Sequence, residues 1–129
     1  MGASLQYAKV VDRQLFLARG GRVQPHLESE IRLREEPGAA GTFLVLRGWG
    51  DDHGTFTEQW RIEGSGGGTV YKSLPRELHL PTRTHVERLE DEITDLEFQY
   101  AADDYAVVFT IDDIDVARAT FTVRSLDEN

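Results

Sequence analysis

The stretch Tyr105–Val123, which reads Tyr-Ala-Val-Val-Phe-Thr-Ile-Asp-Asp-Ile-Asp-Val-Ala-Arg-Ala-Thr-Phe-Thr-Val, decides the fold class. Apolar side chains occupy every second position near both of its ends. They are Tyr105, Val107, Phe109 and Ile111, followed by Ala117, Ala119, Phe121 and Val123. Because successive side chains of a strand point to opposite faces, this period of two predicts two strands, each with one buried and one wet face. The acidic residues Asp112–Asp115 predict the turn that joins them.

The same short alternation recurs along the rest of the chain, and Gly-rich or Pro-containing breakers separate the segments. The predicted strands cover residues 5–11, 14–18, 27–34, 42–49, 55–63, 69–74, 77–80, 96–100, 105–111 and 117–123. Gly64–Gly68 predicts a hairpin loop, and Pro75 and Pro81 confine residues 76–80 to the edge of a sheet. Many short strands at this spacing predict an all-β fold, an antiparallel two-sheet β-sandwich, with a small β-barrel as the alternative.

One segment fits two kinds of secondary structure. Thr84–Glu87 matches a helix capping box. Apolar residues then recur at helical spacing, at Val86, Leu89, Ile93 and Leu96. This pattern favours a short helix near residues 85–95. The alternative is a strand that begins at Val86 and ends in an acidic turn over residues 90–92, and the all-β class holds with either.

The length and charge of the chain limit its domain number and its possible partners. The chain has 129 residues, 14 basic and 23 acidic side chains, a formal net charge of −9 and no cysteine. That length suits one domain, which we predict to span residues 1–129. Without cysteine there are no disulfides and no thiolate metal ligands. Because a phosphate backbone attracts clustered Lys and Arg, the acidic balance predicts no nucleic-acid partner. No signal peptide or membrane-spanning run is recognisable, so we expect a cytoplasmic protein without a membrane partner.

The closing hairpin also resembles that of immunoglobulin-like bacterial β-sandwiches. In those modules a Tyr opens the penultimate strand, a short acidic or Gly turn follows, and the last strand ends in Phe-x-Val. Tyr105, the Asp112–Asp115 turn and Phe121-x-Val123 occupy these positions here, although the turn lacks a glycine. The resemblance covers residues 104–123 and implies an immunoglobulin-like fold, but no particular activity.

The loop between the predicted strands 42–49 and 55–63 is the most site-like stretch. It places Trp49, Asp51, Asp52 and His53 on a turn that glycines flank on both sides. An imidazole that a carboxylate orients is able to act as an acid or base, and we name these residues as candidate ligand-binding residues. The simpler alternative is a hairpin turn in which the carboxylates shape the backbone and His53 is solvated.

Glu58 is the second candidate, because the strand pattern turns it toward the buried face beside Phe56 and Trp60. A buried carboxylate is costly unless it is paired. Glu58 and Trp60 are therefore candidate ligand-binding residues of an aromatic pocket. The alternatives place Glu58 at the sheet margin, or in a pair with an arginine such as Arg47.

The chain carries several acidic clusters but no recognised metal, cofactor or nucleophile motif. Acidic clusters occur at Asp51-Asp52, Glu90–Glu92 with Asp95, Asp103-Asp104, and Asp112–Asp115, so a Ca²⁺-binding sandwich is a third hypothesis. The spacing matches no helix–loop–helix calcium site, no zinc site, no nucleophile elbow and no phosphate-binding loop. We therefore assign no catalytic residue, metal ligand or cofactor.

The favoured function is a non-enzymatic protein-interaction or accessory module. The partner expected is another protein that pairs with an exposed edge such as residues 76–80, and a homo-oligomer is a further option. One alternative is a small-molecule-binding β-barrel, or a cyclase- or isomerase-type enzyme with an aromatic pocket. The other is the Ca²⁺-binding sandwich.

Overall fold

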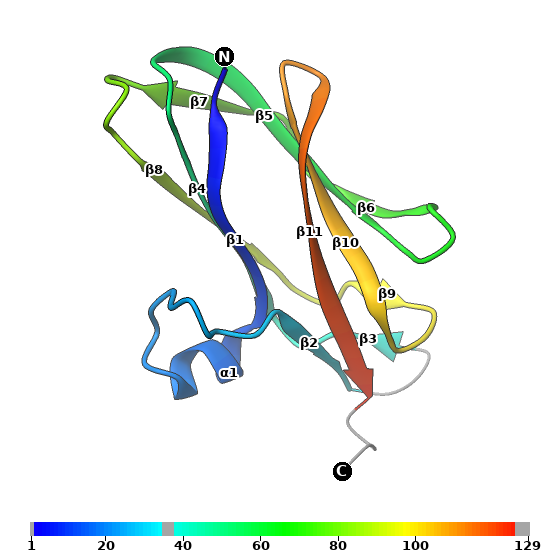
Figure 1. The fold of residues 1–129 in the computed structure, drawn as a ribbon. Helices are drawn as coiled ribbons and strands as arrows, with labels where there is room; N and C mark the ends of the chain where they lie inside the picture. Colours follow the sequence, from blue (N-terminus) through cyan, green and yellow to red (C-terminus); the bar gives the residue numbers. More distant parts are fainter. Residues whose placement is uncertain (1, 35–37, 126–129) are drawn as a thin grey trace. The chain divides into compact units, whose positions relative to one another are not determined.

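The computed structural model describes residues 2–34 and 38–125 (Figure 1). Its elements are, in chain order, β1 (Ser4–Asp12), α1 (Arg13–Ala18), β2 (Glu30–Leu33), β3 (Gly38–Ala39), β4 (Phe43–Gly50), β5 (Gly54–Glu63), β6 (Thr69–Lys72), β7 (Arg76–Leu80), β8 (Glu87–Ile93), β9 (Glu97–Phe98), β10 (Ala102–Ile111) and β11 (Ile114–Ser125). The all-β class predicted from the alternation is therefore confirmed. Among the described residues, no helix has the length and apolar character needed to cross a membrane.

Within the described residues, the strands form three sheets. One sheet has the order β1-β4-β8, a second has the order β2-β11-β10-β5-β6 with β7 also on β5, and the third pairs β3 with β9. The pairs of β5 with β6, β7 and β10 are antiparallel, as predicted. The pair of β2 with β11 is parallel, which the sequence did not indicate.

The chain divides into two compact units, each made of three stretches. The first unit contains Met1–Ala8, Arg47–Leu89 and Ala106–Ala119, and the second contains Lys9–Leu46, Glu90–Tyr105 and Thr120–Asn129. Strands β1, β4, β8, β10 and β11 contribute residues to both. The two units are described separately below.

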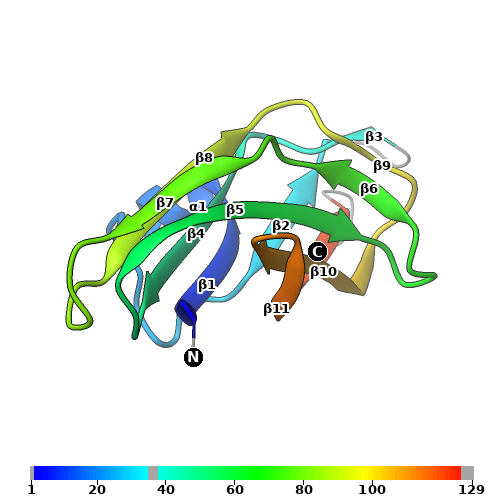
Figure 2. The ribbon, with the colours of Figure 1, turned by 90° about the horizontal axis from the view of Figure 1, so that it is seen from above.

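Strand β5 is the central strand of the first unit. On one side it pairs with β10, where Phe109 lies opposite Trp60. On the other side β7 and β6 follow one another along it (Figure 2). The loop Gly64–Gly68 joins β5 to β6, as the glycine run predicted. Among the described residues β7 has β5 as its only neighbouring strand, so the predicted edge strand is confirmed.

The core of the first unit joins side chains from two sheets. Trp49 on β4 lies edge-on against Phe109 on β10, with ring centroids 6.0 Å apart and an interplanar angle of 81°. Both rings are fully buried. Within this unit, the three-stranded and six-stranded sheets therefore pack face to face, which is the arrangement of a β-sandwich.

The second unit has a core of its own. Its apolar side chains are contributed by β1, α1, the loop after α1 and β4, and are Val11, Phe16, Leu27, Leu44 and Leu46. Aromatic rings of this unit also pack together, because Tyr105 lies edge-on to Phe98 and stacks on Phe121, at centroid distances of 5.2 and 5.8 Å. The Tyr105 hydroxyl donates a hydrogen bond to the Tyr100 carbonyl at 2.7 Å. This bond returns to the backbone a few residues upstream, as in the tyrosine corner of immunoglobulin-type sandwiches.

One prediction of secondary structure was wrong, and a second segment takes the alternative that the sequence left open. Residues 14–18, expected as a strand, lie in helix α1, because the Asp12 carboxylate accepts the Leu15 N–H at 3.1 Å and caps the helix. Residues near 85–95, where the pattern favoured a helix and left a strand as the alternative, contain strand β8, whose side chains alternate between half-buried and exposed. Pairing with β4 outweighs the capping motif, and the Glu87 carboxylate contacts the His85 imidazole instead.

The turn between β10 and β11 adopts an unusual backbone conformation. Asp112 and Asp113 have φ angles of 51° and 69°. Two successive left-handed residues characterise the type I′ turn, which matches the twist of a two-residue hairpin. Asp fills positions where Asn or Gly is more common, and this accounts for the missing glycine. The Asp112 carboxylate also accepts the Thr57 N–H at 2.9 Å.

Candidate functional site

Glu58 is the buried carboxylate that the strand pattern predicted, and it lies in the first unit with a side-chain exposure of only 1%. Arg47 Nε donates to its Oε2 at 2.8 Å, and Arg47 Nη2 donates to its Oε1 at 2.6 Å. Trp49 Nε1 donates to Oε2 at 2.7 Å. Three donors therefore hold both oxygens of this carboxylate, and of the alternatives for Glu58 the structure contains the pair with Arg47.

The two tryptophans among the candidate ligand-binding residues are packed against other rings. Trp49 contacts Phe109, and Trp60 lies 5.5 Å from the Tyr71 ring with an angle of 39°. Trp60 also lines a hollow of about 140 Å³, together with mostly polar residues. These are Gln59, Arg61, Lys72, Thr110, Asp113 and Asp115. Glu58 is not among the residues that line it.

The loop residues Asp51, Asp52 and His53 shape the turn between β4 and β5. Asp51 has φ 65°, and its carboxylate accepts the Gln6 amide N–H at 2.8 Å. The Asp52 carboxylate accepts the backbone N–H groups of Gly2 and His53, each at 2.8 Å. His53 is 59% exposed, and its Nδ1 lies 3.7 Å from Asp52 Oδ1. These contacts match the hairpin-turn alternative.

The electrostatic setting of Asp52 favours its ionised form. The hydrogen bond from the His53 backbone N–H is the largest influence and lowers the pKa of the Asp52 carboxyl. Burial acts in the opposite direction, and Gly2, Arg83 and His53 add smaller lowering effects. Asp52 is therefore a hydrogen-bond acceptor at neutral pH rather than a proton donor.

The predicted site residues form two groups in the structure. Trp49 and Glu58 share a hydrogen bond inside the core, whereas Asp51, Asp52 and His53 lie in the loop. Among the described residues, the hydrogen-bond partners given above for the two groups have no member in common. No hydrogen bond given above therefore links an acid or base of the loop to Trp49 or Glu58.

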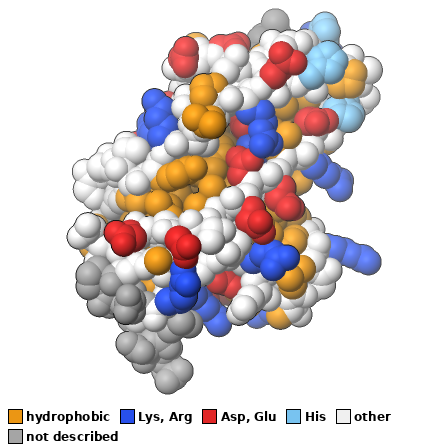
Figure 3. Space-filling view, turned by 180° about the vertical axis from the view of Figure 1, so that it is seen from behind, with side chains coloured by type: hydrophobic (Ala, Val, Ile, Leu, Met, Phe, Trp, Pro, Cys, Tyr) orange, Lys and Arg blue, Asp and Glu red, His pale blue; other side chains and the backbone are white. Residues whose placement is uncertain are grey.

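Members of two of the acidic clusters considered for Ca²⁺ engage basic side chains. Glu92 pairs with Arg13, Asp95 pairs with Arg34, and Asp115 pairs with Arg61. Histidine side chains gather at one end of the face in Figure 3. His79 Nδ1 lies 3.2 Å from the Thr55 hydroxyl, and His85 Nε2 lies 2.8 Å from a Glu87 oxygen. Within residues 2–34 and 38–125, no three His, Asp or Glu side chains converge in an arrangement that would hold a metal ion.

An ion-pair network on β5 and β11 was not anticipated. Arg61 donates to Asp115 through Nη1 and Nη2 at 3.1 and 3.0 Å, and through Nε to Glu63 at 2.8 Å. Arg118 donates to the other Glu63 oxygen at 3.0 Å. The Arg61 hydrogen bonds are the main cause that lowers the pKa of both carboxyls. The register that brings these distant residues together is not visible in a single sequence.

In the second unit, the larger hollow is open and polar, with a volume of about 470 Å³. Its charged lining mixes both signs, and consists of Lys9, Glu28, Glu30, Asp103 and Arg124. Two of these charges are already paired, because Arg124 Nε donates to Glu30 at 3.2 Å. The mixed lining singles out neither an anionic nor a cationic ligand.

Comparisons with known proteins describe the fold and leave the family open. No protein-family model matches the chain, and no curated protein matches it. Among solved structures, the chain resembles the alkylpurine DNA glycosylase AlkC of Pseudomonas fluorescens bound to DNA containing an abasic site analog. The TM-score is 0.51 and the sequence identity is 16%, over 95% of this chain and 30% of that one. The chain thus spans less than a third of the glycosylase, and the likeness shows a shared fold.

This likeness corrects one expectation. The net charge of −9 predicted the absence of a nucleic-acid partner. That exclusion is contradicted, because a solved structure that the chain resembles is a glycosylase bound to DNA. Net charge sums the whole chain, whereas a nucleic acid contacts one face, so the sum does not exclude such a partner.

Proposed function

We propose that this chain is a non-enzymatic accessory module with an immunoglobulin-like sandwich fold that acts in the cytoplasm. The complete pairing of the Glu58 carboxylate supports the non-enzymatic part of this proposal. Arg47 and Trp49 together donate to both of its oxygens. A general acid or base needs a free position within hydrogen-bond reach of its substrate. The Tyr105–Tyr100 hydrogen bond supports the immunoglobulin-like part.

We further propose that nucleic acid is the partner of this module. The observation that carries the proposal is the fold likeness to part of a glycosylase bound to DNA. In this proposal the module holds the duplex through contacts to the phosphate backbone. Such contacts carry little sequence information, so the module is expected to bind DNA of unrelated sequences with similar affinity.

Fluorescence anisotropy with labelled DNA tests this proposal. The purified full-length chain is titrated into two duplexes of unrelated sequence, at salt concentrations from about 50 to about 200 mM. We expect saturable binding with similar affinity for both, and a linear decrease of log K with log salt. Absence of saturable binding at the lowest salt would overturn the proposal. A purified acidic β-sandwich of similar charge serves as the control for non-specific association.

A protein partner is the second candidate, and one edge in the first unit favours it. Strand β11 pairs with β2 only from Thr122 onward, so its earlier part has an open edge among the described residues. Ile114 and Val116 lie there with 66% and 46% of their surfaces exposed. An extended peptide is able to add to such an edge through backbone hydrogen bonds.

Affinity purification of the tagged chain tests this second candidate. The wild type is compared with a variant that carries both Ile114→Lys and Val116→Lys, because charged side chains discourage edge pairing. We expect one protein at near-equal amount with the wild type and its loss with the variant. An identical set of bound proteins with both chains would rule out this edge as the binding site.

A further inference from the structure

Charge is distributed very unevenly along the chain. Residues 13–27, which we call the basic segment, form its longest stretch without Asp or Glu. Within it lie Arg13, Arg19, Arg22 and His26. The basic segment therefore carries a positive net charge, which the net charge of −9 for the whole chain conceals.

The structure anchors the basic segment at both ends. Phe16 and Leu27 are 7% and 4% exposed and belong to the apolar core of the second unit. The helix α1 ends at the left-handed Gly20, with φ 96°, and the Gly21 N–H donates to the Phe16 carbonyl at 2.9 Å. This pattern of a left-handed glycine and a returning N–H closes a helix firmly. The residues between Phe16 and Leu27 are therefore held in place at both ends.

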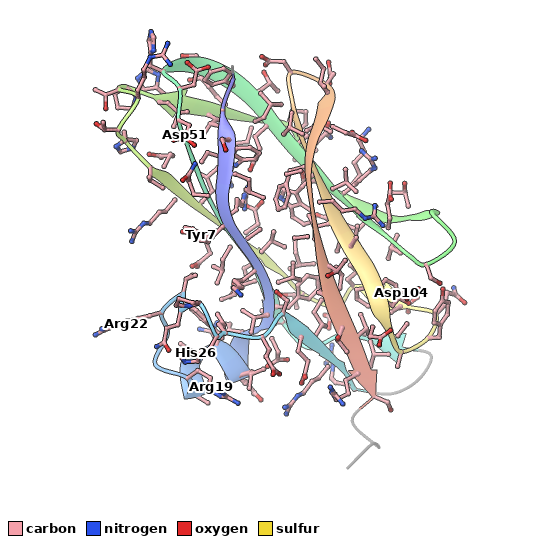
Figure 4. The ribbon with its side chains drawn as sticks, in the orientation of Figure 1. Tyr7, Arg19, Arg22, His26, Asp51 and Asp104 are labelled. Carbon is pink, nitrogen blue, oxygen red and sulfur yellow. The ribbon has the colours of Figure 1, made fainter. Side chains whose placement is uncertain are left out.

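The side chains of Arg19, Arg22 and His26 are exposed, and they project from the C-cap of α1 and the loop that follows it (Figure 4). Within residues 2–34 and 38–125, none of these three forms an ion pair or a side-chain hydrogen bond. Arg13 differs, because its Nε lies 3.1 Å from a Glu92 oxygen. Lys9 adds a further ammonium beside the loop, since its Nζ donates to the Pro25 carbonyl at 3.5 Å.

Most other surface arginines are already paired with acids. The pairs are Arg32 with Glu30, Arg34 with Asp95, Arg61 with Asp115, Arg118 with Glu63 and Arg124 with Glu30. At those places a phosphate would have to displace a carboxylate. The two acids that flank the basic segment in the sequence compete little with a phosphate for its arginines. Asp12 is largely buried as the helix cap, and only Glu28 is exposed.

We propose that the basic segment is the surface on which this module contacts the phosphate backbone of nucleic acid, with Arg19 and Arg22 as the principal contacts. The inference rests on the proposed nucleic-acid function and names its site. A guanidinium presents two parallel N–H donors that match two phosphate oxygens. Both arginines meet this requirement without breaking an existing ion pair.

The test compares two double variants of the full-length chain. One carries Arg19→Ala and Arg22→Ala. The matched control carries Lys72→Ala and Arg88→Ala, which removes the same charge from exposed residues of the first unit that form no ion pair within the described part of the chain. Thermal melting of both variants establishes that folding is intact. A third variant, with Arg19→Lys and Arg22→Lys, restores the charge.

Anisotropy with a labelled duplex gives the readout. Each phosphate contact contributes about 0.9 to the slope of log K against log salt, so loss of two contacts lowers the slope by about 1.8. Raising salt from about 50 to about 200 mM should therefore weaken wild-type binding about twelvefold more than binding of the alanine variant. The lysine variant should keep the wild-type slope, and the control variant should change it little.

The outcomes separate this inference from the proposed function. If the wild-type chain binds no duplex, the proposed nucleic-acid function fails, and the inference fails with it. If the wild type binds and the alanine variant has the same slope as the control, the basic segment is the wrong surface while the function stands. Binding to vesicles of anionic lipid in the absence of DNA binding would overturn both.

Discussion

Arg47 and Glu58 form a buried two-point ion pair, in which Nε and Nη2 donate to separate carboxylate oxygens at 2.8 and 2.6 Å. Their side chains are 0% and 1% exposed. A guanidinium that loses this partner would stay in the core without its counter-charge. The pair therefore makes each residue depend on the other, whether or not it adds net stability.

Removal of the carboxylate alone should destabilise the protein strongly. Glu58→Ala is expected to lower the free energy of unfolding by about 3–5 kcal/mol, because Arg47 keeps its charge in the core. Replacing both residues, Arg47→Met with Glu58→Leu, should cost less than the single change. Denaturant titration followed by tryptophan fluorescence measures both. The exposed residue Glu90 provides the control, since Glu90→Ala should stay within about 0.5 kcal/mol of the wild type.

Gly48 on β4 provides space for an aromatic ring. A Cβ at this position would overlap the ring of Tyr7 on β1. Gly48→Ala should therefore cost about 1–3 kcal/mol, as other overpacking changes do. In a chain that also carries Tyr7→Ala, the same substitution should cost much less. Equal costs in both backgrounds, measured by denaturant titration, would show that the ring does not set the requirement for glycine.

The network around Arg61 should make stability depend on acid. Glu63 and Asp115 have pKa values lowered from their usual 4.5 and 3.8. A lowered folded-state pKa contributes stability that is complete above the unfolded value and is lost as pH falls through the folded one. Tm should therefore fall as pH decreases below about 4.5. Arg61→Gln should flatten that decrease, whereas Arg88→Gln should leave it unchanged. Parallel curves for Arg61→Gln and the wild type would contradict the role of Arg61.

The hairpin turn should respond to substitution at Asp113, whose φ is 69°. Glycine adopts this conformation without strain, so Asp113→Gly should raise the free energy of unfolding by about 0.5 kcal/mol. A β-branched side chain is strained there, and Asp113→Val should lower it by about 1–2 kcal/mol. Thermal melting ranks the three chains. An order in which the valine variant is the most stable would be incompatible with a left-handed residue at this position.

Period-two patterns were sufficient to predict most strands. The stripe of Tyr105, Val107, Phe109 and Ile111 lies in β10, and the glycine run at 64–68 forms the predicted loop. These features are local, because the backbone itself directs alternate side chains to opposite faces. The same logic placed Glu58 inward, and the choice of Arg47 as its partner was one of several that the sequence left open.

The sequence by itself determined an all-β chain, its main turns and its inward carboxylate. Only the tertiary structure decided that residues 13–18 form a capped helix and 87–93 a strand, because segments this short take their conformation from caps and neighbouring strands. It also decided which charges are neutralised, since pairs such as Arg61–Asp115 join residues far apart in the chain. Arg19 and Arg22 stay unpaired in the described chain for the same reason: the fold brings no described acid to them.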